Sequence, residues 1–196
     1  VKISPDTATM GNAADGFYRG GGYHYDDQKI QGFSHMHLYA TGITGHGVLA
    51  SMPSDGMDAS KTNRDGYGMV FSHEEEWASV GLYEVHLDGI EVSLTATEHT
   101  ALHEYRFDER VEVPTILIDV AHAMGRGIVS GGEIHISEDR QHVEGTLIMD
   151  GELGKAFPIF FYGSFSQAAT SVGTWQGNVV SDAHDQSQSE EGQELG

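Results

Sequence analysis

Aromatic, acidic and imidazole side chains are concentrated in residues 22–38, near the start of the chain. A pyranose sugar stacks its apolar C–H face on aromatic rings, and carboxylates and imidazoles hold its hydroxyl groups. The residue types in this region therefore predict sugar contacts. The candidate contacts are Tyr23, Tyr25, Asp26, Asp27, His35 and His37, with Trp77 further along the chain.

Two histidines in the same region allow a different chemistry. His35 and His37 are two positions apart, so within a strand both side chains would project to the same side. Two imidazoles placed in this way can bind a transition metal, with Asp26 or Asp27 as a third ligand. We favour polar contacts within a hydrogen-bonded loop, because the sequence places no third ligand. We therefore assign no metal ligand and no catalytic residue to this chain.

Acidic residues elsewhere give weaker signals. Glu74, Glu75 and Glu76 could contribute to a calcium site, but no Asp-x-Asp-x-Asp-Gly loop is present, and a solvated turn explains Glu74 and Glu75. Glu98 and His103 resemble an acid/base pair only superficially, since 30 acidic residues offer too many such pairs. The sequence has no Gly-x-Ser-x-Gly, His-Glu-x-x-His or P-loop motif.

The charge of the chain limits its partners. Thirty acidic and 10 basic residues give a formal net charge of −20. Such a surface repels nucleic-acid backbones and anionic membranes, so we expect neither as a partner. No apolar run is long enough to span a bilayer, and the absence of cysteine excludes disulfides and thiolate metal sites. The chain begins at Val1 rather than at methionine, and we expect a partial sequence.

Apolar–polar alternation and turn signals predict a series of strands from residue 82 onward. The expected strands are 82–87, 90–95, 101–107, 115–120, 133–136, 142–149 and 157–165. Asp88-Gly89 predicts a hairpin and Asp150-Gly151 another turn. The run 115–120 is almost continuously apolar, as expected for a strand that is covered on both faces.

The rest of the chain completes the predicted architecture. Residues 1–80 are expected to form loops and short strands, and no segment has a helical apolar stripe. We predict an all-β, antiparallel β-sandwich with a single domain over residues 1–180. Residues 181–196 are polar and acidic, and we expect a disordered tail or loop that ends at a truncation point.

Several segments resemble, in order and spacing, the opening of the α-mannosidases of glycoside hydrolase family 92. The first are Ile3-Ser4-Pro5-Asp6-Thr7, residues 22–27 and residues 32–38; the later ones are 71–83, 95–107 and Gly173-Thr174-Trp175. The usual family pattern is similar to Ser-His-Thr-His-Leu-Ser-Gly-Thr-Gly, part of which is replaced here by Met36 and Tyr39-Ala40-Thr41-Gly42.

The resemblance implies an N-terminal β-sandwich of the galactose-mutarotase-like supersandwich type, followed by a larger helical catalytic domain. The family enzymes are calcium-dependent exo-α-mannosidases, and the acid, the base and most calcium ligands belong to the helical domain. This chain is therefore expected to contribute contacts to a mannose-containing glycan and to be inactive alone. The family further implies a secreted or periplasmic bacterial protein.

Two alternatives from other classes stay open. One is a purely structural domain whose apparent site is an interface with another domain; Trp175 is expected to be a core or interdomain residue rather than a sugar contact. The other is a stand-alone metal-dependent enzyme built on His35 and His37.

Overall fold

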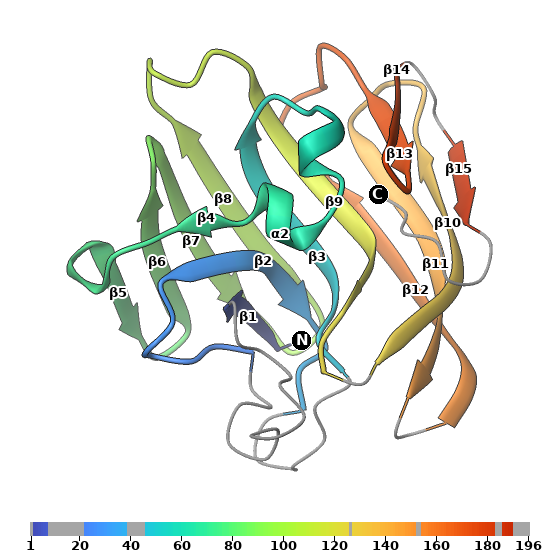
Figure 1. Cartoon of the computed structure of the whole chain (residues 1–196), viewed down its shortest axis with the longest axis horizontal. Helices are drawn as coiled ribbons and strands as arrows, with labels where there is room; N and C mark the ends of the chain where they lie inside the picture. Colours follow the sequence, from blue (N-terminus) through green and yellow to red (C-terminus); the bar gives the residue numbers. More distant parts are fainter. Residues whose placement is uncertain are drawn as a thin grey trace.

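The computed structural model describes residues 2–7, 22–38, 46–125, 127–151, 154–182 and 186–189, and these form mostly antiparallel strands (Figure 1). Their helical elements are one short helix, α2 (Arg64–Tyr67), and two 3-10 turns, η1 (Ala59–Lys61) and η2 (His73–Glu75). Within these ranges, no helix has the length and apolar character needed to cross a membrane.

The strands form three main sheets and a separate hairpin. The central sheet has the order β1 (Ile3–Thr7), β2 (Lys29–His35), β3 (Val48–Asp55) and β9 (Pro114–Ala123), with β4 (Met69–Val70) also paired to β2. The second sheet contains β5 (Glu76–Ser79), β6 (Leu82–Leu87), β7 (Ile90–Ala96) and β8 (Ala101–Phe107) in sequence order. The third has the order β12 (Gly154–Ser164), β11 (His142–Gly151), β10 (Ile128–Ile136) and β15 (Gln186–Ser189). The hairpin pairs β13 (Gly173–Gln176) with β14 (Val179–Asp182).

The central sheet is covered on both faces, as the three layers in Figure 1 show. On one face Phe33 of β2 and Met52 of β3 pack in one cluster with Leu87 and Val92 of the second sheet. On the other face Val48 packs with apolar side chains of the third sheet. The prediction for β9 is confirmed: Leu117 packs in the first cluster, whereas Ile118 and Val120 pack in a third cluster with Ile134 and Val143 of the third sheet.

The predicted antiparallel sandwich is confirmed, and each strand predicted after residue 82 corresponds to one of β6 to β12. Asp88 and Gly89 form the two-residue turn between the paired residues Leu87 and Ile90, with φ angles of 40° and 87°. Positive φ at both positions is the requirement of a type I′ hairpin, and an Asp-Gly pair meets it. The turn predicted at Asp150-Gly151 is wrong, because both residues belong to β11 and Gly151 pairs with Gly154.

Two other expectations need correction. The first 80 residues contain full strands rather than short ones, with seven residues in β2 and eight in β3. Polar residues such as Ser34 and Ser54 are buried in these strands, which hides the alternation that a half-buried strand normally shows. Within the expected tail, residues 186–189 form β15 on the edge of β10, because main-chain pairing needs no apolar side chain. The remaining tail residues, 183–185 and 190–196, lie outside the described ranges.

Candidate functional site

An aromatic and acidic surface lies where the segment before β2 meets η2 and β5. We call Tyr23, Tyr25, Asp26, His73 and Glu76 the aromatic rim. The Tyr25 ring stacks on the His73 ring, with centroids 4.0 Å apart and an interplanar angle of 7°. Tyr25 is nevertheless 66% exposed, so much of its side chain faces solvent. An exposed, supported ring of this kind can stack on an apolar face of a ligand.

His73 is the centre of the rim. Its Nδ1 lies 2.6 Å from Glu76 Oε2, and its Nε2 lies 2.5 Å from the main-chain carbonyl oxygen of Tyr25. Both partners are acceptors, so the ring can donate to both only when both of its nitrogens carry a proton. The hydrogen bond to Glu76 is the main reason why the pKa of His73 is raised. Phe71 meets the same ring at an interplanar angle of 89°.

Glu76 also fixes Tyr23, the second tyrosine of the rim. The Tyr23 hydroxyl donates to Glu76 Oε2 over 2.9 Å. Burial and the carboxylate of Glu76 raise the pKa of Tyr23, and the same two causes raise the pKa of Tyr83. Both phenols therefore remain neutral at any ordinary pH, and Tyr23 acts as a donor that fixes the carboxylate.

Asp26 and Asp27 have opposite surroundings. The side chain of Asp26 is 85% exposed next to Tyr25, and its backbone N–H donates to His24 Nδ1 over 3.2 Å. Asp27 is buried and accepts a 2.6 Å hydrogen bond from the Thr7 hydroxyl of β1. The carboxylate of Asp26 is thus exposed to solvent, whereas Asp27 connects the rim segment to the central sheet through a hydrogen bond.

His35 and His37 do not project to the same side, and that prediction is wrong. β2 ends at His35, and Met36 has a φ angle of 65°, which breaks the two-residue periodicity of the strand. His35 Nδ1 donates to the Leu49 carbonyl over 2.7 Å, and its Nε2 lies 3.0 Å from His103 Nε2. The two-histidine geometry required for a metal-dependent enzyme is therefore not formed.

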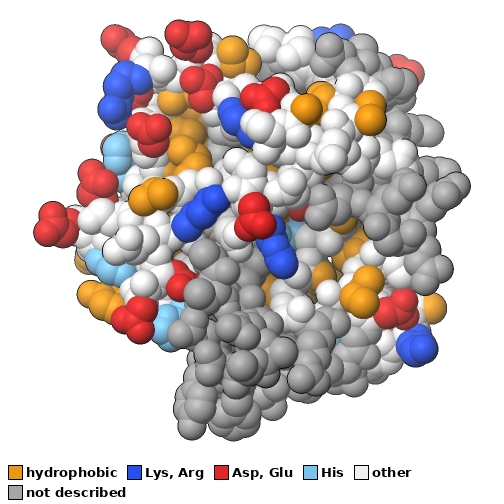
Figure 2. All heavy atoms as spheres, in the orientation of Figure 1, with side chains coloured by type: hydrophobic (Ala, Val, Ile, Leu, Met, Phe, Trp, Pro, Cys, Tyr) orange, Lys and Arg blue, Asp and Glu red, His pale blue; other side chains and the backbone are white. Residues whose placement is uncertain are grey.

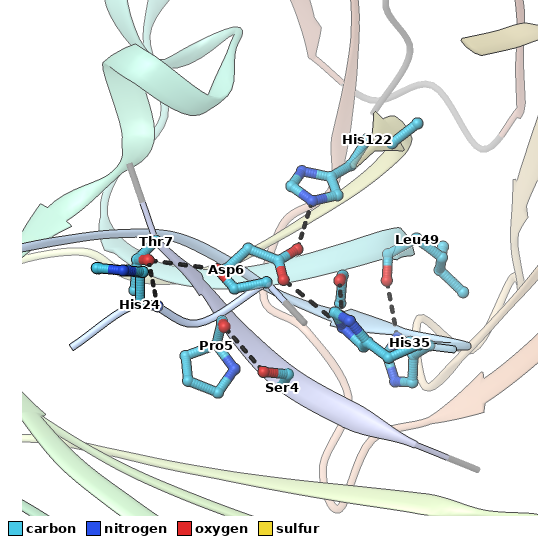
Figure 3. A network of polar contacts seen from close by, with 12 residues as sticks. Ser4, Pro5, Asp6, Thr7, His24, His35, Leu49 and His122 are labelled. Atoms are coloured by element: carbon cyan, nitrogen blue, oxygen red, sulfur yellow. Dashed lines mark hydrogen bonds and ion pairs between the residues drawn. The ribbon is translucent and has the colours of Figure 1, made fainter. Parts of the chain in front are cut away.

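His37 instead belongs to a buried polar cluster with Asp6 and His122. Figure 3 shows the contact between Asp6 and His122. His122 Nε2 lies 2.7 Å from one carboxylate oxygen of Asp6, and His37 Nε2 lies 3.5 Å from the other. The side chains of all three are fully buried. His37 also contacts Ser34 Oγ over 2.9 Å, and burial lowers its pKa despite the attraction of Asp6. Asp27 and His37 are thus engaged inside the domain rather than presented at its surface.

Trp77 is 52% exposed but does not face the aromatic rim. In β5 it lies opposite Glu84, whereas its neighbour Glu76 lies opposite the buried Val85. Successive side chains of a strand point to opposite faces, so Trp77 lies on the outer face of the second sheet. Trp175 is buried in the first core, and its Nε1 donates to the Thr62 carbonyl over 3.0 Å, which confirms it as a core residue.

The residues that are described do not fit a calcium ion. Within them, no group of three or more acidic or histidine side chains is arranged to hold a metal. Glu76 is occupied by Tyr23 and His73, and Glu74 and Glu75 are exposed beside it. Figure 2 shows acidic side chains spread over one face of the molecule rather than gathered at one point.

Sequence reasoning did not identify the partners that organise these sites. In the segment that contains His73, the sequence signal is the run of glutamates. The role of His73 depends instead on contact with Tyr25, 48 positions away. His103 was considered with Glu98, but its partner is His35, 68 positions away. Glu98 lies near His99 instead, 3.7 Å away and at the surface. No local signal could have paired Asp6 with His122, which are 116 positions apart.

The three antiparallel sheets define a β-sandwich domain. The chain belongs to the glycosyl hydrolase family 92 N-terminal domain, which it matches over residues 1–196. It is 26% identical to an uncharacterized secreted glycosidase from Arthroderma benhamiae, with 77% of this chain and 20% of the relative covered.

Solved structures share the fold. A family 92 α-mannosidase from Bacteroides thetaiotaomicron, in complex with mannoimidazole, superposes with a TM-score of 0.82 at 22% identity, covering 98% of this chain and 26% of that one. A family 92 inverting mannosidase from the same organism gives a TM-score of 0.77 at 24% identity, covering 98% and 24%. The chain thus spans about a quarter or less of the length of these proteins.

Proposed function

We propose that this chain is the non-catalytic N-terminal domain of an α-mannosidase-like glycoside hydrolase and contributes contacts to a mannose-containing glycan. The observation that carries the proposal is the exposed ring of Tyr25, stacked on His73 and adjacent to the exposed carboxylate of Asp26. An aromatic face next to a hydroxyl acceptor is the combination that a pyranose requires.

The candidate residues differ in their exposure and therefore in their proposed roles. Tyr25 and Asp26 contact the sugar, with Tyr23 at the edge of the same surface. Trp77 offers a separate aromatic contact on the outer face of the second sheet. Asp27 supports the rim segment from within through its hydrogen bond to Thr7, whereas the hydrogen bonds described above for His35 and His37 lie inside the domain and involve no residue of the rim.

Mannose is the proposed sugar because two structures with the same fold are named as α-mannosidase and inverting mannosidase, one of them bound to mannoimidazole. Inverting hydrolysis requires two carboxyl groups on opposite sides of the scissile bond. We assign these groups, and any calcium ion, to a helical catalytic domain that completes the site. The chain alone is therefore inactive, and secretion is proposed from the name of the fungal relative.

Calorimetric titration of the chain tests this function. The ligands are mannose oligosaccharides, yeast mannan and a β-glucan, each with and without calcium. Saturable binding to the mannose ligands supports the proposal, and calcium is expected to make no difference. Binding to none of them contradicts independent glycan recognition.

A second candidate function is packing against another domain, and a specific observation favours it. Phe160 and Tyr162 of β12 are 76% and 66% exposed, and both project from the outer face of the third sheet. Exposed aromatic patches of this kind often mark interfaces. Sedimentation analysis tests this candidate: self-association that is lost in Phe160→Ser would support an interface on β12.

A further inference from the structure

The support beneath Tyr25 has three components. The His73 ring lies parallel to the Tyr25 ring at 4.0 Å, which leaves the opposite ring face as the one available for stacking. His73 Nε2 holds the main-chain carbonyl of the same tyrosine, and His73 Nδ1 is held by Glu76. Glu76 is itself fixed by the Tyr23 hydroxyl. Ring and backbone of Tyr25 are thus anchored through one imidazole.

We propose that His73 is a positioning residue that holds Tyr25 as a flat platform for a pyranose ring, and that it does so as the imidazolium. This inference rests on the proposed function and adds to it the residue that prepares the binding surface and the charge state in which it works. A ring fixed before binding loses less conformational freedom when the sugar stacks on it, which improves affinity.

The charge state follows from hydrogen-bond counting. A neutral imidazole has one N–H donor, whereas His73 faces two acceptors, Glu76 Oε2 and the Tyr25 carbonyl oxygen. Loss of the proton therefore breaks one of the two anchors. The other groups around the ring favour the cation or are neutral. Asp26 adds a negative charge, and Phe71 and Tyr25 contribute aromatic surfaces. The Tyr23 hydroxyl, 3.4 Å from His73 Nδ1, is neutral and donates to Glu76.

The pKa of His73 determines how sugar affinity changes with pH. The hydrogen bond to Glu76 raises the pKa of His73, so the imidazolium persists to higher pH than it would in a free histidine. As the pH rises through that raised pKa, His73 loses a proton and one of its two hydrogen bonds, so Tyr25 is held less rigidly. Sugar affinity is therefore expected to be constant in mild acid and to fall on the alkaline side.

Titration of the chain and of His73→Gln with mannobiose and yeast mannan, at pH values from 5.5 to 9, tests this inference. Glutamine can donate to one acceptor but provides neither the charge nor the stacked ring. We expect His73→Gln to bind about 5- to 10-fold more weakly at pH 6 and to lose the alkaline decline. His142→Gln is the matched control, because His142 stacks beneath Tyr162, which is also 66% exposed, on the third sheet.

A readout that is independent of sugar distinguishes the possible failures. NMR titration of the His73 ring should give a midpoint above the ordinary histidine value of 6.5, and Glu76→Gln should lower it. Thermal unfolding confirms that each variant is folded. Binding by the natural chain that His73→Gln leaves unchanged overturns this inference but not the proposed function. Absence of binding by the natural chain overturns both, even where the NMR midpoint is raised.

Discussion

His103 of β8 and His35 of β2 meet between two sheets, with their Nε2 atoms 3.0 Å apart. The Leu49 carbonyl determines which of the two histidines donates. A carbonyl oxygen can only accept, so the proton of His35 is on Nδ1, which donates to Leu49. Neutral His35 then has a bare Nε2 that accepts from His103. His103 Nδ1 in turn accepts from the hydroxyl of Ser51 or Tyr105, 3.2 Å and 3.0 Å away. Both histidines must be neutral for this chain of hydrogen bonds to exist.

This arrangement predicts that the domain loses stability in mild acid. Burial lowers the pKa of both rings, that of His103 to about 3. The pKa of His103 is 6.5 in the unfolded chain and about 3 in the folded one. Between these two pH values the unfolded chain binds a proton that the folded chain does not. The unfolding free energy is therefore greatest above pH 6.5 and decreases as the pH falls toward 3. Between pH 7 and pH 5, His103 alone should cost about 2 kcal/mol of unfolding free energy.

Urea unfolding of the chain and of His103→Gln at pH 7 and pH 5 checks this expectation. The variant cannot be protonated at this position, so its stability should change less between the two pH values. His99→Gln, at an exposed position, should behave like the natural chain. An equal loss in His103→Gln and the natural chain would show that the pair is not responsible.

The buried pair of Tyr67 and Asp119 gives a second prediction. The Tyr67 hydroxyl donates to Asp119 Oδ2 over 2.7 Å, and burial already raises the pKa of Asp119. Tyr67→Phe leaves a buried carboxylate with one donor fewer and should cost about 2–3 kcal/mol at pH 7. Tyr105→Phe removes the hydroxyl that contacts two neutral groups, Ser51 and His103, and should cost only about 1 kcal/mol. Urea unfolding of both variants measures the two costs. Equal losses of unfolding free energy would contradict this ranking.

Gly22 gives a third prediction. Its φ angle is 91°, and a Cβ at this position would lie 2.3 Å from Asp6 Oδ1 and 2.9 Å from His37 Cε1. Gly22→Ala should therefore suffer both backbone strain and a collision with the buried polar cluster. Gly81 has a similar φ of 83° with no atom within 4 Å of the added Cβ, so Gly81→Ala isolates the backbone strain.

We expect a cost of about 1–2 kcal/mol for Gly81→Ala and about 1–3 kcal/mol more for Gly22→Ala. Thermal unfolding midpoints of the two variants measure the difference. Equal midpoints would mean that the cluster of Asp6, His37 and His122 adapts without cost, and would contradict the tight packing described here.

Six strands of the second and third sheets, β6 to β8 and β10 to β12, could be predicted because each pairs with a neighbour in the sequence, whereas β5 and β15 were not predicted. Strands β6 and β7 alternate apolar and polar residues around an Asp-Gly turn, and both signals are local. The central sheet was less predictable because its first strands bury polar side chains. Ser4, Asp6, Thr7 and Ser34 are all buried there, and local periodicity cannot distinguish them from loop residues.

The candidate site could be predicted in its residue types but not in its geometry. The concentration of aromatic and acidic residues before β2 did identify the exposed Tyr25 and Asp26. The sequence could not show that Asp27 turns inward to Thr7, or that Met36 separates His35 from His37. These outcomes depend on contacts between distant segments, which no local pattern specifies.

Calorimetric titration of the natural chain and of Tyr25→Ala with mannose oligosaccharides tests the central claim most directly. Loss of about 60 Å² of apolar stacking corresponds to about 1.5 kcal/mol, or roughly tenfold in affinity. Tyr25→Ala is therefore predicted to bind about tenfold more weakly, while Tyr162→Ala, an equally exposed tyrosine on the third sheet, binds as the natural chain does. Equal affinities for Tyr25→Ala and the natural chain would contradict the claim that the aromatic rim contacts the glycan.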